Sequence, residues 1–567
     1  MLFGIDVGGT HTDAVLLDKK GGILASVKIP TDPSDLLGSM TSAIEEVLKE
    51  VKDPEIERFN LSTTLCTNAI VQDELVPVGV LVSAGPGINP WVFKIGEHYE
   101  VIEGALDHRG TEIRPLNTKQ AQEVISSFLK EGIEVFAIVG KFSPRNPIHE
   151  ERLASLVGER ASFITMGHSL SGQLNFPRRI ATAYYNSAVW PIFNSFLNSV
   201  TDSLKRFNLS PQLNILKADG GTMPLSKATT TPVESIFSGP AASVMGIIAL
   251  CDITQDAIVL DIGGTTTDIG VFASGEPLIE PENVRLRHRP TLVRAMKVKS
   301  IGLGGDSAVV VSGGNISVGP KRMGPAMARG GSVPTLIDAF NCLSSYSYGD
   351  KGASVEGMKQ IGNELACGVE GAPSRVIETA CTRLRKEVMD FLDEINERPI
   401  YTVHELLEYR KIEPEVIYLM GGPAEIMAPY IKKEFGLPVV IPQHSSVANA
   451  IGAALARPTI QVELFADTEK KIMTIPVFDI KRTISGSYSL KEAREETISQ
   501  LMGFIKKEFG WEITREDTQV IEESCMNMVK DVFTVGQDIR VKCQVKPGIC
   551  KEYENIVRCL CREQKTI

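Results

Sequence analysis

The chain has 567 residues, of which 43% are hydrophobic and 23% charged, and its formal net charge is −11. A chain of this length divides into several domains, and its acidic balance argues against nucleic acid as the main partner, because phosphate backbones are bound by basic surfaces. No apolar run approaches the about 20 residues that span a bilayer, and the N-terminus does not resemble a signal peptide. We therefore expect a cytoplasmic protein whose ten cysteines are mostly reduced.

The first feature along the chain is a glycine-rich turn between two apolar runs. The octapeptide Asp6-Val-Gly-Gly-Thr-His-Thr-Asp13 lies between Leu2–Ile5 and Ala14–Leu17, a pattern that predicts a β-hairpin. The octapeptide Asp261-Ile-Gly-Gly-Thr-Thr-Thr-Asp268 repeats it in the second half of the chain, again between apolar runs. Two matching hairpins predict two related lobes.

Both turns have the composition of a phosphate-binding turn. A Gly-Gly pair lets backbone N–H groups approach a phosphate without side chains in the way, and the threonine hydroxyls that follow add donors. We therefore expect a nucleotide between the lobes. Its phosphate cradle would consist of Gly8, Gly9, Thr10, Gly263, Gly264, Thr265 and Thr266.

Asp6 and Asp261 end the strands that lead into these turns. Carboxylates beside a phosphate site hold Mg²⁺ or its waters more often than they contact phosphate, so we expect both to act as catalytic metal ligands. The alternative is a pair of ordinary hairpins with turn-capping aspartates. That alternative is stronger for Asp13 and Asp268, because an Asp at a hairpin end often bonds only its own turn.

Between and after the hairpins the periodicity predicts several elements. Amphipathic helices are expected over residues 34–51, 118–129 and 181–204, the last as a link between the lobes, and buried strands over 76–82 and 135–139. Two segments rich in small residues, Ser238–Gly246 and Val447–Leu455, are expected to form helices that cross between the lobes. Ser238 is the expected N-cap of the first.

The last third of the chain contains a glycine-rich stretch and a tail. Residues 302–331 include nine glycines and Asp306, and we expect a binding loop or lid, with Asp306 either facing the nucleotide or closing a turn. The tail from residue 458 has an expected helix over 490–509 and an expected strand over 538–545. Its cysteines have spacings that match no common metal pattern, which leaves buried or free thiols as the simpler interpretation: Cys543, Cys550, Cys559 and Cys561.

The paired Asp-x-Gly-Gly-Thr hairpins resemble the signature of the actin-like ATPase superfamily. Tyr418-Leu-Met-Gly-Gly-Pro-Ala-Glu425 is similar to the adenosine motif of that superfamily, so the resemblance implies that Gly421 and Gly422 flank the adenosine. Within the superfamily the chain resembles the hydantoinase A/oxoprolinase family. The stretches that carry this likeness are the opening octapeptide, Thr63–Ala69, Phe142–Glu150, Ser238–Ala241, Asp261–Asp268 and Ile301–Ser307.

The resemblance implies an α/β fold of two ribonuclease H-like lobes around an ATP cleft. The expected division is residues 1–185 with an inserted subdomain, residues 186–457, and an α+β extension over residues 458–567. The implied activity is ATP- and Mg²⁺-dependent opening of a five-membered cyclic amide, such as a hydantoin or 5-oxoproline, through phosphorylation of the amide oxygen. Two alternatives stay open: an ATPase subunit of a ketone carboxylase, and an actin-like ATPase that regulates a partner.

The chain departs from the family pattern at two positions, where His11 replaces Phe and Asp306 interrupts a glycine run. Many relatives work with a separate B-type chain, so a partner subunit and self-association both stay open.

On the substrate side we expect His11, Thr64 and Asn68 to be catalytic, with Thr67 as a further hydrogen-bonding group. The simpler interpretation of the threonines and asparagine is a turn or helix cap. His149 and His168 are candidate acid/base groups or metal ligands, with a structural role as the alternative.

Overall fold

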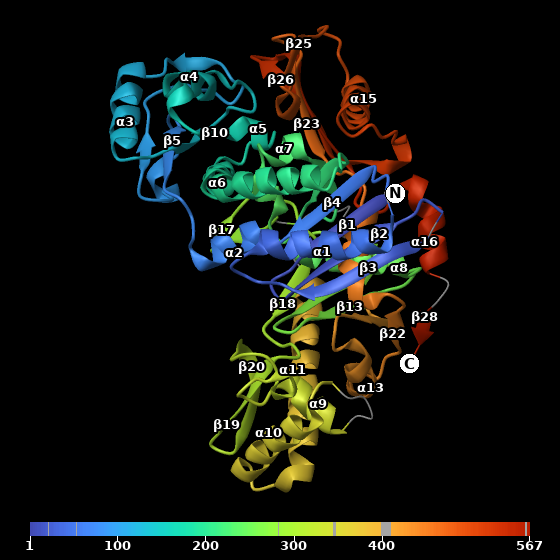
Figure 1. Cartoon of the computed structure of the whole chain (residues 1–567). Helices are drawn as coiled ribbons and strands as arrows, with labels where there is room; N and C mark the ends of the chain where they lie inside the picture. Colours follow the sequence, from blue (N-terminus) through green and yellow to red (C-terminus); the bar gives the residue numbers. More distant parts are fainter. Residues whose placement is uncertain are drawn as a thin grey trace.

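The computed structural model describes residues 1–20, 22–52, 54–281, 283–343, 348–397, 410–561 and 564–566. Figure 1 shows two lobes in the centre, a smaller α/β unit beside the first lobe, a helical extension on the second, and a β-rich part formed by the C-terminal segment. No helix among the described residues is long and apolar enough to cross a membrane.

The first lobe is built on a six-stranded sheet. In spatial order its strands are β12 (Thr222–Pro224), β11 (Gln212–Leu216), β4 (Arg58–Thr63), β1 (Leu2–Val7), β2 (His11–Leu17) and β3 (Ile23–Pro30). β1, β4 and β11 run parallel, so their carboxyl ends meet at one edge of the sheet. All six residues of β1 are buried, as expected for a strand covered on both faces.

The second lobe repeats this arrangement. In spatial order its strands are β15 (Glu276–Pro277), β14 (Thr267–Ala273), β13 (Ala257–Ile262), β21 (Val416–Met420), β22 (Val439–Pro442) and β28 (Gln564–Thr566), with β18 (Val298–Ile301) also beside β14. The β13–β14 hairpin pairs Asp261 with Asp268, as the β1–β2 hairpin pairs Asp6 with Asp13. The two lobes are therefore related copies, as the repeated octapeptide predicts.

Two helices of small residues pack between the sheets, which confirms the expected crossing. They are α8 (Ser238–Leu250) and α14 (Ala448–Leu455). A Cβ atom on Gly452 would lie 2.3 Å from the backbone nitrogen of Gly246, and one on Gly4 of β1 would lie 2.1 Å from the carbonyl oxygen of Ala450. Only glycine at these positions allows the backbones to approach this closely. The two helices thereby tie the lobes to one core.

Ser238 does not cap α8. The N-cap is Phe237, whose φ of 55° is left-handed, and Ser238 is the first helical residue. Its hydroxyl instead donates to the carbonyl oxygen of Thr63 at 3.0 Å and so joins the helix to the end of β4. The capping prediction was wrong because the tertiary contact took the hydroxyl.

Helix α1 (Leu36–Glu50) follows the first hairpin, and the chain beyond β4 and α2 (Leu65–Gln72) builds a second sheet, which we propose belongs to an inserted subdomain. Its four-stranded sheet has the order β10 (Phe163–Met166), β9 (Val135–Gly140), β5 (Val78–Ser83) and β6 (Tyr99–Val101). Helices α3 (Thr118–Lys130) and α4 (Ile148–Val157) cover it (Figure 1). Short β7 (Ala105–Leu106) and β8 (Glu112–Arg114) form a separate ribbon.

The helix expected over residues 181–204 is longer, and it does not link the lobes. It is α6 (Phe176–Arg206), and it packs on β9, β10 and α2 (Leu65–Gln72) inside the first lobe. Its buried face, which includes Tyr185, Val189 and Phe193, explains this position. The expected boundary at residue 185 falls inside this helix. Because β11 and β12 follow it and pair in the sheet of β1, we propose that the first lobe continues through β12.

The helical extension of the second lobe contains α9 (Leu336–Leu343), α10 (Lys351–Glu364) and α11 (Gly368–Asn396). The glycine-rich stretch before them is mostly a hairpin, β19 (Ser307–Ser312) and β20 (Asn315–Arg322), rather than the expected loop. Gly313 and Gly314 both have positive φ and make its two-residue turn. Helix α13 (Ala424–Phe435) follows β21.

The C-terminal domain is an antiparallel sheet with one helix on it. Its strands are β25 (Ile480–Thr483), β24 (Ile472–Ile475), β23 (Gln461–Asp467), β27 (Phe533–Val545) and β26 (Thr518–Lys530). Helix α15 (Leu490–Phe509) has the expected bounds, and β27 contains the expected strand. The short helix α16 (Glu554–Leu560) then contacts α8.

Candidate active site

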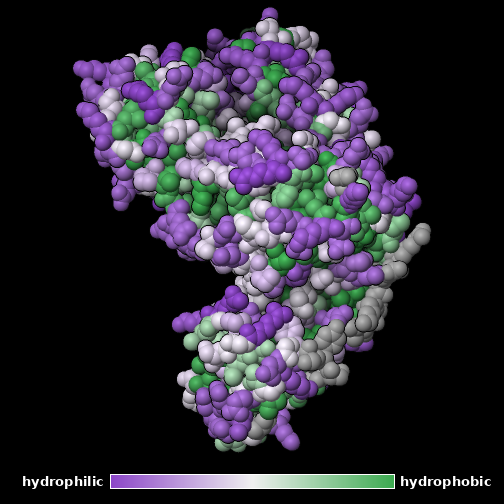
Figure 2. All heavy atoms as spheres, in the orientation of Figure 1, coloured by the Kyte–Doolittle hydropathy of each residue, from purple (hydrophilic) through white to green (hydrophobic). Residues whose placement is uncertain are grey.

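The two glycine turns have the same local structure and lie against each other. Gly8 N donates to His11 O at 3.1 Å, and Gly263 N donates to Thr266 O at 2.9 Å, so each turn closes in the same way. A Cβ atom on Gly264 would lie 3.3 Å from Cγ2 of Thr10. The expected cradle residues of both lobes therefore face one shared space. Figure 2 shows a notch between the upper body and the helical extension, with hydrophilic side chains along its rims.

Asp6 and Asp261 are linked by one amide group. Nδ2 of Asn449, in the first turn of α14, donates to Oδ2 of Asp6 at 3.2 Å and to Oδ2 of Asp261 at 3.3 Å. Ser243 of α8 donates to the same oxygen of Asp261 at 2.6 Å. The two lobe-crossing helices thus hold the two carboxylates together.

The electrostatics of this carboxylate group favour a cation. Burial raises the pKa of Asp6, with hydrogen bonds from Ser62 and Asn449 opposing the shift and the charge of Asp261 adding to it. Oδ1 of Asp6 is buried and has no hydrogen-bond partner among the described residues. A buried carboxylate oxygen without a hydrogen-bond donor raises the free energy of the folded state unless a cation compensates its charge. The residues therefore fit a hard divalent cation such as Mg²⁺, which prefers oxygen ligands.

Asp13 and Asp268 lie on the second strand of each hairpin, where they pair with Asp6 and Asp261. Burial raises the pKa of Asp13 to about 7 against the charge of Lys28, whose Nζ bonds both carboxylate oxygens at 2.7 Å. Burial and the charge of Asp261 raise the pKa of Asp268 to about 7, and Ser300 donates to it. Within the described residues, no three His, Cys, Asp or Glu side chains are arranged to hold a metal on their own. A bound cation would therefore need oxygens from a phosphate or water as well.

Cations surround the carboxylates and make a positive rim. Burial, Lys28, Arg329 and Arg322 lower the pKa of His11 to about 4, so His11 is neutral at pH 7. Arg322, at the end of β20, pairs with Asp306 at 3.1 Å, and Arg329 stacks on the ring of Tyr348 at 4.2 Å. These charges belong to both lobes and point to an anion between them.

Asp306 lies on the second turn. Its backbone nitrogen donates to Gly264 O at 2.7 Å, and Gly305 N donates to Gly263 O at 3.0 Å. Residues 302–306 therefore back the phosphate turn, and the Asp306 carboxylate lies at its edge and pairs with Arg322.

A cavity of about 630 Å³ adjoins the carboxylates on the second lobe. Gly421 and Gly422 line it together with Tyr348, His444 and Ser446. Gly421 has a φ of 95°, and a Cβ atom there would lie 2.8 Å from Oδ1 of Asp261, so the glycine brings the cavity wall against the carboxylate. Lys28 Nζ donates to Ser446 O at 3.0 Å and joins the cavity to the first lobe. Its size and position suit a nucleoside.

On the first lobe, Thr64 and Asn68 lie at the start of α2, one strand from the first turn. Thr64 N donates to Val7 O at 3.3 Å, and Nδ2 of Asn68 donates to Oγ1 of Thr64 at 3.4 Å. Thr67 has a structural bond instead, because its Oγ1 accepts from the backbone nitrogen of Phe237 at 2.9 Å. Thr64 and Asn68 are therefore close to the phosphate turn, as a substrate-binding role requires.

Comparison with known proteins decides the family. The hydantoinase/oxoprolinase family model matches residues 179–462, and the model of the N-terminal region of that family matches residues 2–161. The chain belongs to the hydantoinase/oxoprolinase family.

One relative is caprolactamase subunit alpha of Pseudomonas jessenii, which is 24% identical over 498 residues, or 80% of this chain and 70% of its own length. The crystal structure of ATP-dependent caprolactamase from the same organism superposes with a TM-score of 0.67 and 18% identity, over 97% of this chain and 88% of that chain. Nucleotide-free acetone carboxylase gives the same TM-score with 16% identity and the same coverage. Together with the repeated sheets, these likenesses confirm the two-lobed α/β fold.

Some expected residues of this hydantoinase/oxoprolinase chain lie outside the site. His149 belongs to the inserted subdomain, where its ring bonds Ser83 and Glu112 at 2.9 Å each. His168 bonds the buried Glu150 at 2.5 Å; burial opposes its charge, yet this carboxylate raises its pKa overall. Both histidines therefore bond side chains away from the paired carboxylates.

The tail cysteines also lie apart from the site. Cys543 and Cys550 are buried, Cys561 is partly buried and Cys559 is exposed, and the described residues form no metal-binding group around them.

The sequence did not point to five residues of the site: Lys28, Ser243, Arg322, Arg329 and Asn449. Asn449 had a detectable signal, because it is the single polar side chain within a helix otherwise made of small apolar residues. The three cations had none, since each lies on a separate element and only the tertiary structure brings it to the rim.

Proposed function

We propose that the chain is an ATP-dependent hydrolase that opens a cyclic amide, of the five-membered hydantoin or 5-oxoproline type, through phosphorylation of the amide oxygen. The observation that carries the proposal is the pair of carboxylates, Asp6 and Asp261, joined by Asn449 between two phosphate-type turns and beside a nucleoside-sized cavity. Mg²⁺ held by these carboxylates would neutralise phosphate charge.

The chemistry needs activation because amide resonance makes a ring amide a poor electrophile. Transfer of the terminal phosphoryl group of ATP to the amide oxygen forms an O–P bond, breaks the P–O bond to ADP and leaves the ring carbon electrophilic. Water then adds to that carbon, the ring C–N bond breaks and leaves an acyl phosphate, and a second water releases phosphate from it to give the open carboxylic acid. The ring nitrogen takes up a proton as the bond breaks.

The chain's own residues contribute position and charge. The backbone N–H groups of both turns, Lys28 and the two arginines of the rim would hold the phosphates. His11 is neutral at pH 7 and can donate or accept a single hydrogen bond at the reacting oxygen. Thr64 and Asn68, one strand away, would hydrogen-bond the ring.

Relatives whose names identify them as subunits support a partner chain as well. The P. jessenii relative is named as the alpha subunit of caprolactamase, and a relative in Xanthobacter autotrophicus is named as the beta subunit of acetone carboxylase. A carboxylase-type ATPase subunit is therefore the second candidate, and it needs partner chains for its activity.

The test is phosphate release from Mg-ATP by the purified chain, with and without hydantoins, 5-oxoproline and caprolactam. Asp261→Asn should lower the ring-stimulated rate at least about hundredfold, whereas Asp390→Asn, on the exposed face of α11, should leave it unchanged. Stimulation by one ring, lost in Asp261→Asn, supports the proposal and names the substrate class. Steady hydrolysis that no ring changes favours the partner-dependent candidate, and absence of nucleotide binding contradicts both.

A further inference from the structure

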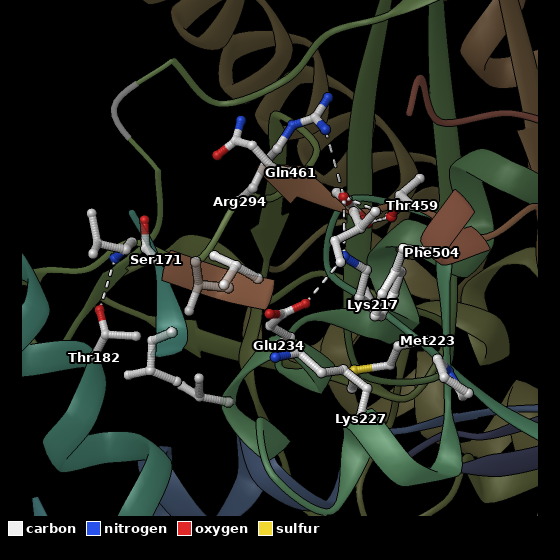
Figure 3. A pocket seen from close by; sticks show the side chains of 18 of the residues that line it. Ser171, Thr182, Lys217, Met223, Lys227, Glu234, Arg294, Thr459, Gln461 and Phe504 are labelled. Atoms are coloured by element: carbon white, nitrogen blue, oxygen red, sulfur yellow. Dashed lines mark hydrogen bonds and ion pairs between the residues drawn. The ribbon is translucent and has the colours of Figure 1, made fainter. Parts of the chain in front are cut away.

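A second cavity lies away from the carboxylates. It has a volume of about 70 Å³ and is enclosed by the first lobe, residues 292–294 and the C-terminal domain (Figure 3). Its polar wall includes Lys217, Asp219, Lys227, Glu234, Arg294 and Thr459. Lys217 and Asp219 directly follow β11, so the cavity lies at the same sheet edge as the first phosphate turn, about 10 Å along it at the usual spacing between strands.

Two charged groups of this wall, Asp219 and Lys217, have neighbours that compensate their charges. Asp219 accepts from Thr459 Oγ1 at 2.9 Å and from Gly221 N at 3.1 Å. Lys217 donates to Glu234 at 3.1 Å and lies 3.5 Å from Asp219. Those carboxylates raise the pKa of Lys217 although burial opposes them, and they compensate its charge.

Two cations of the wall are left without adequate partners. The ammonium of Lys227 makes no ion pair or hydrogen bond with any described residue, although Figure 3 shows its side chain extended toward Glu234. Arg294 has one ion pair among the described residues, a loose contact of 3.7 Å to Asp219, which already serves Lys217 and Thr459. Burial lowers the pKa of both Lys227 and Arg294. Both side chains are only partly exposed, and a partly desolvated cation without a close partner is stabilised by an added anion.

The charge and size of the cavity limit what that anion is. Three cations face two carboxylates, so one negative charge balances the wall. The volume of about 70 Å³ restricts this anion to a small molecule. Met223, Val293 and Phe504 add an apolar side that suits a short aliphatic tail.

We propose that this cavity binds a small monocarboxylate, whose oxygens accept from Lys227 and Arg294 while its short tail lies against the apolar side. Two kinds of ligand carry such a carboxylate: a free monocarboxylate, and a ring compound such as 5-oxoproline. Either ligand makes the cavity a ligand site separate from the nucleotide site.

The experiment is isothermal titration of the full chain, without nucleotide, with propionate in one arm and 5-oxoproline in the other. Binding should saturate in at least one arm. It should weaken about tenfold or more in Lys227→Met and in Arg294→Met, because each removes a charge-assisted hydrogen bond. Lys481→Met, on the exposed strand β25, is the matched control and should bind like the wild type.

A thermal-unfolding measurement separates lost binding from lost folding. Lys227→Met removes a charge that makes no ion pair, so its Tm without ligand should stay close to that of the wild type, and the ligand should raise the Tm of the wild type but not that of this variant. No saturation up to about 50 mM in either arm, unchanged binding in both variants, or equally tight binding of inorganic phosphate would each overturn the proposal. None of these readouts uses ATP, so failure of the proposed catalytic function leaves the test intact.

Discussion

At the residue scale, the amide of Asn449 holds together the two carboxylates of the site. It is the one described group that bonds both Asp6 and Asp261. In Asn449→Ala the carboxylates lose a shared donor and repel each other, so kcat/KM for ATP should fall about ten- to hundredfold. Asn315→Ala, at the exposed start of β20, is the control. Steady-state phosphate release from both variants checks this, and a change of less than twofold in Asn449→Ala would show that the bridge is not needed.

Asp268 gives a pH-dependence with a defined sign. Its folded pKa is raised to about 7 from the ordinary 3.8, so the folded chain keeps a proton that the unfolded chain releases. The free energy of unfolding should therefore fall as the pH rises from about 4 to about 7 and level off above that. Asp268→Asn removes this penalty. Because solvent reaches part of the side chain, we expect the variant to be more stable by about 2 kcal/mol at pH 7.5 and equal to the wild type near pH 4.

Urea unfolding at several pH values, in the absence of Mg²⁺ and nucleotide, measures this difference. Asp390→Asn, exposed on α11, should give no difference at any pH. A stability gap between Asp268→Asn and the wild type that stays constant from pH 4 to 7.5 would contradict the linkage.

At the element scale, the crossing of α8 and α14 requires glycine where the two backbones touch. A Cβ atom on Gly452 of α14 would meet the backbone of α8, with Gly246 N at 2.3 Å and Ala242 O at 2.7 Å. Backbone atoms cannot yield as a flexible side chain can, so Gly452→Ala should destabilise the chain by about 2–3 kcal/mol. It should also weaken nucleotide binding, because the displaced helix carries Asn449.

Gly503→Ala is the matched control for this prediction. Gly503 lies inside α15 with open space around it, so alanine there should instead stabilise the chain by about 0.5–1 kcal/mol. Chemical denaturation of the two variants compares them directly, and a Gly452→Ala variant as stable as the wild type would mean that the helices separate at little cost.

These elements also show which features of the fold the sequence could predict and which it could not. The repeated octapeptide predicted two hairpins and their relation, and apolar periodicity predicted α15 to the residue, because these signals are local. The cap at Ser238 and the linking role of residues 181–204 were wrong because tertiary contacts decided both. The same difference holds for the site. The sequence predicted the glycine turns, whereas the rim made of Lys28, Arg322 and Arg329 comes from three separate elements that only the tertiary structure brings together.

At the scale of the whole molecule, the C-terminal domain is part of the central core rather than an appendage. One continuous apolar cluster joins Leu2 of β1, Ile247 of α8 and Ile451 of α14 to Leu464 of β23 and Leu501 of α15. Arg58 of β4 lies 3.7 Å from the ring of Trp511 and bonds the Tyr553 hydroxyl at 2.8 Å, which fixes the domain to the first sheet. Both lobe-crossing helices therefore depend on the tail for part of their burial.

This arrangement predicts that removal of the tail unfolds the lobes. A chain ending at residue 457 would expose the apolar sides of α8 and α14 that the tail covers, and because folded domains are usually stable by only about 5–15 kcal/mol, we expect insoluble protein. Val532→Ser with Phe533→Ser, at the exposed tip of the β26–β27 hairpin, is the control, because these side chains are 84% and 73% exposed and their loss should leave the Tm within a few degrees of the wild-type value. Soluble yield and circular dichroism of the two variants test this prediction: a truncated chain that melts cooperatively near the wild-type Tm would mean that the two lobes hold the site without the tail.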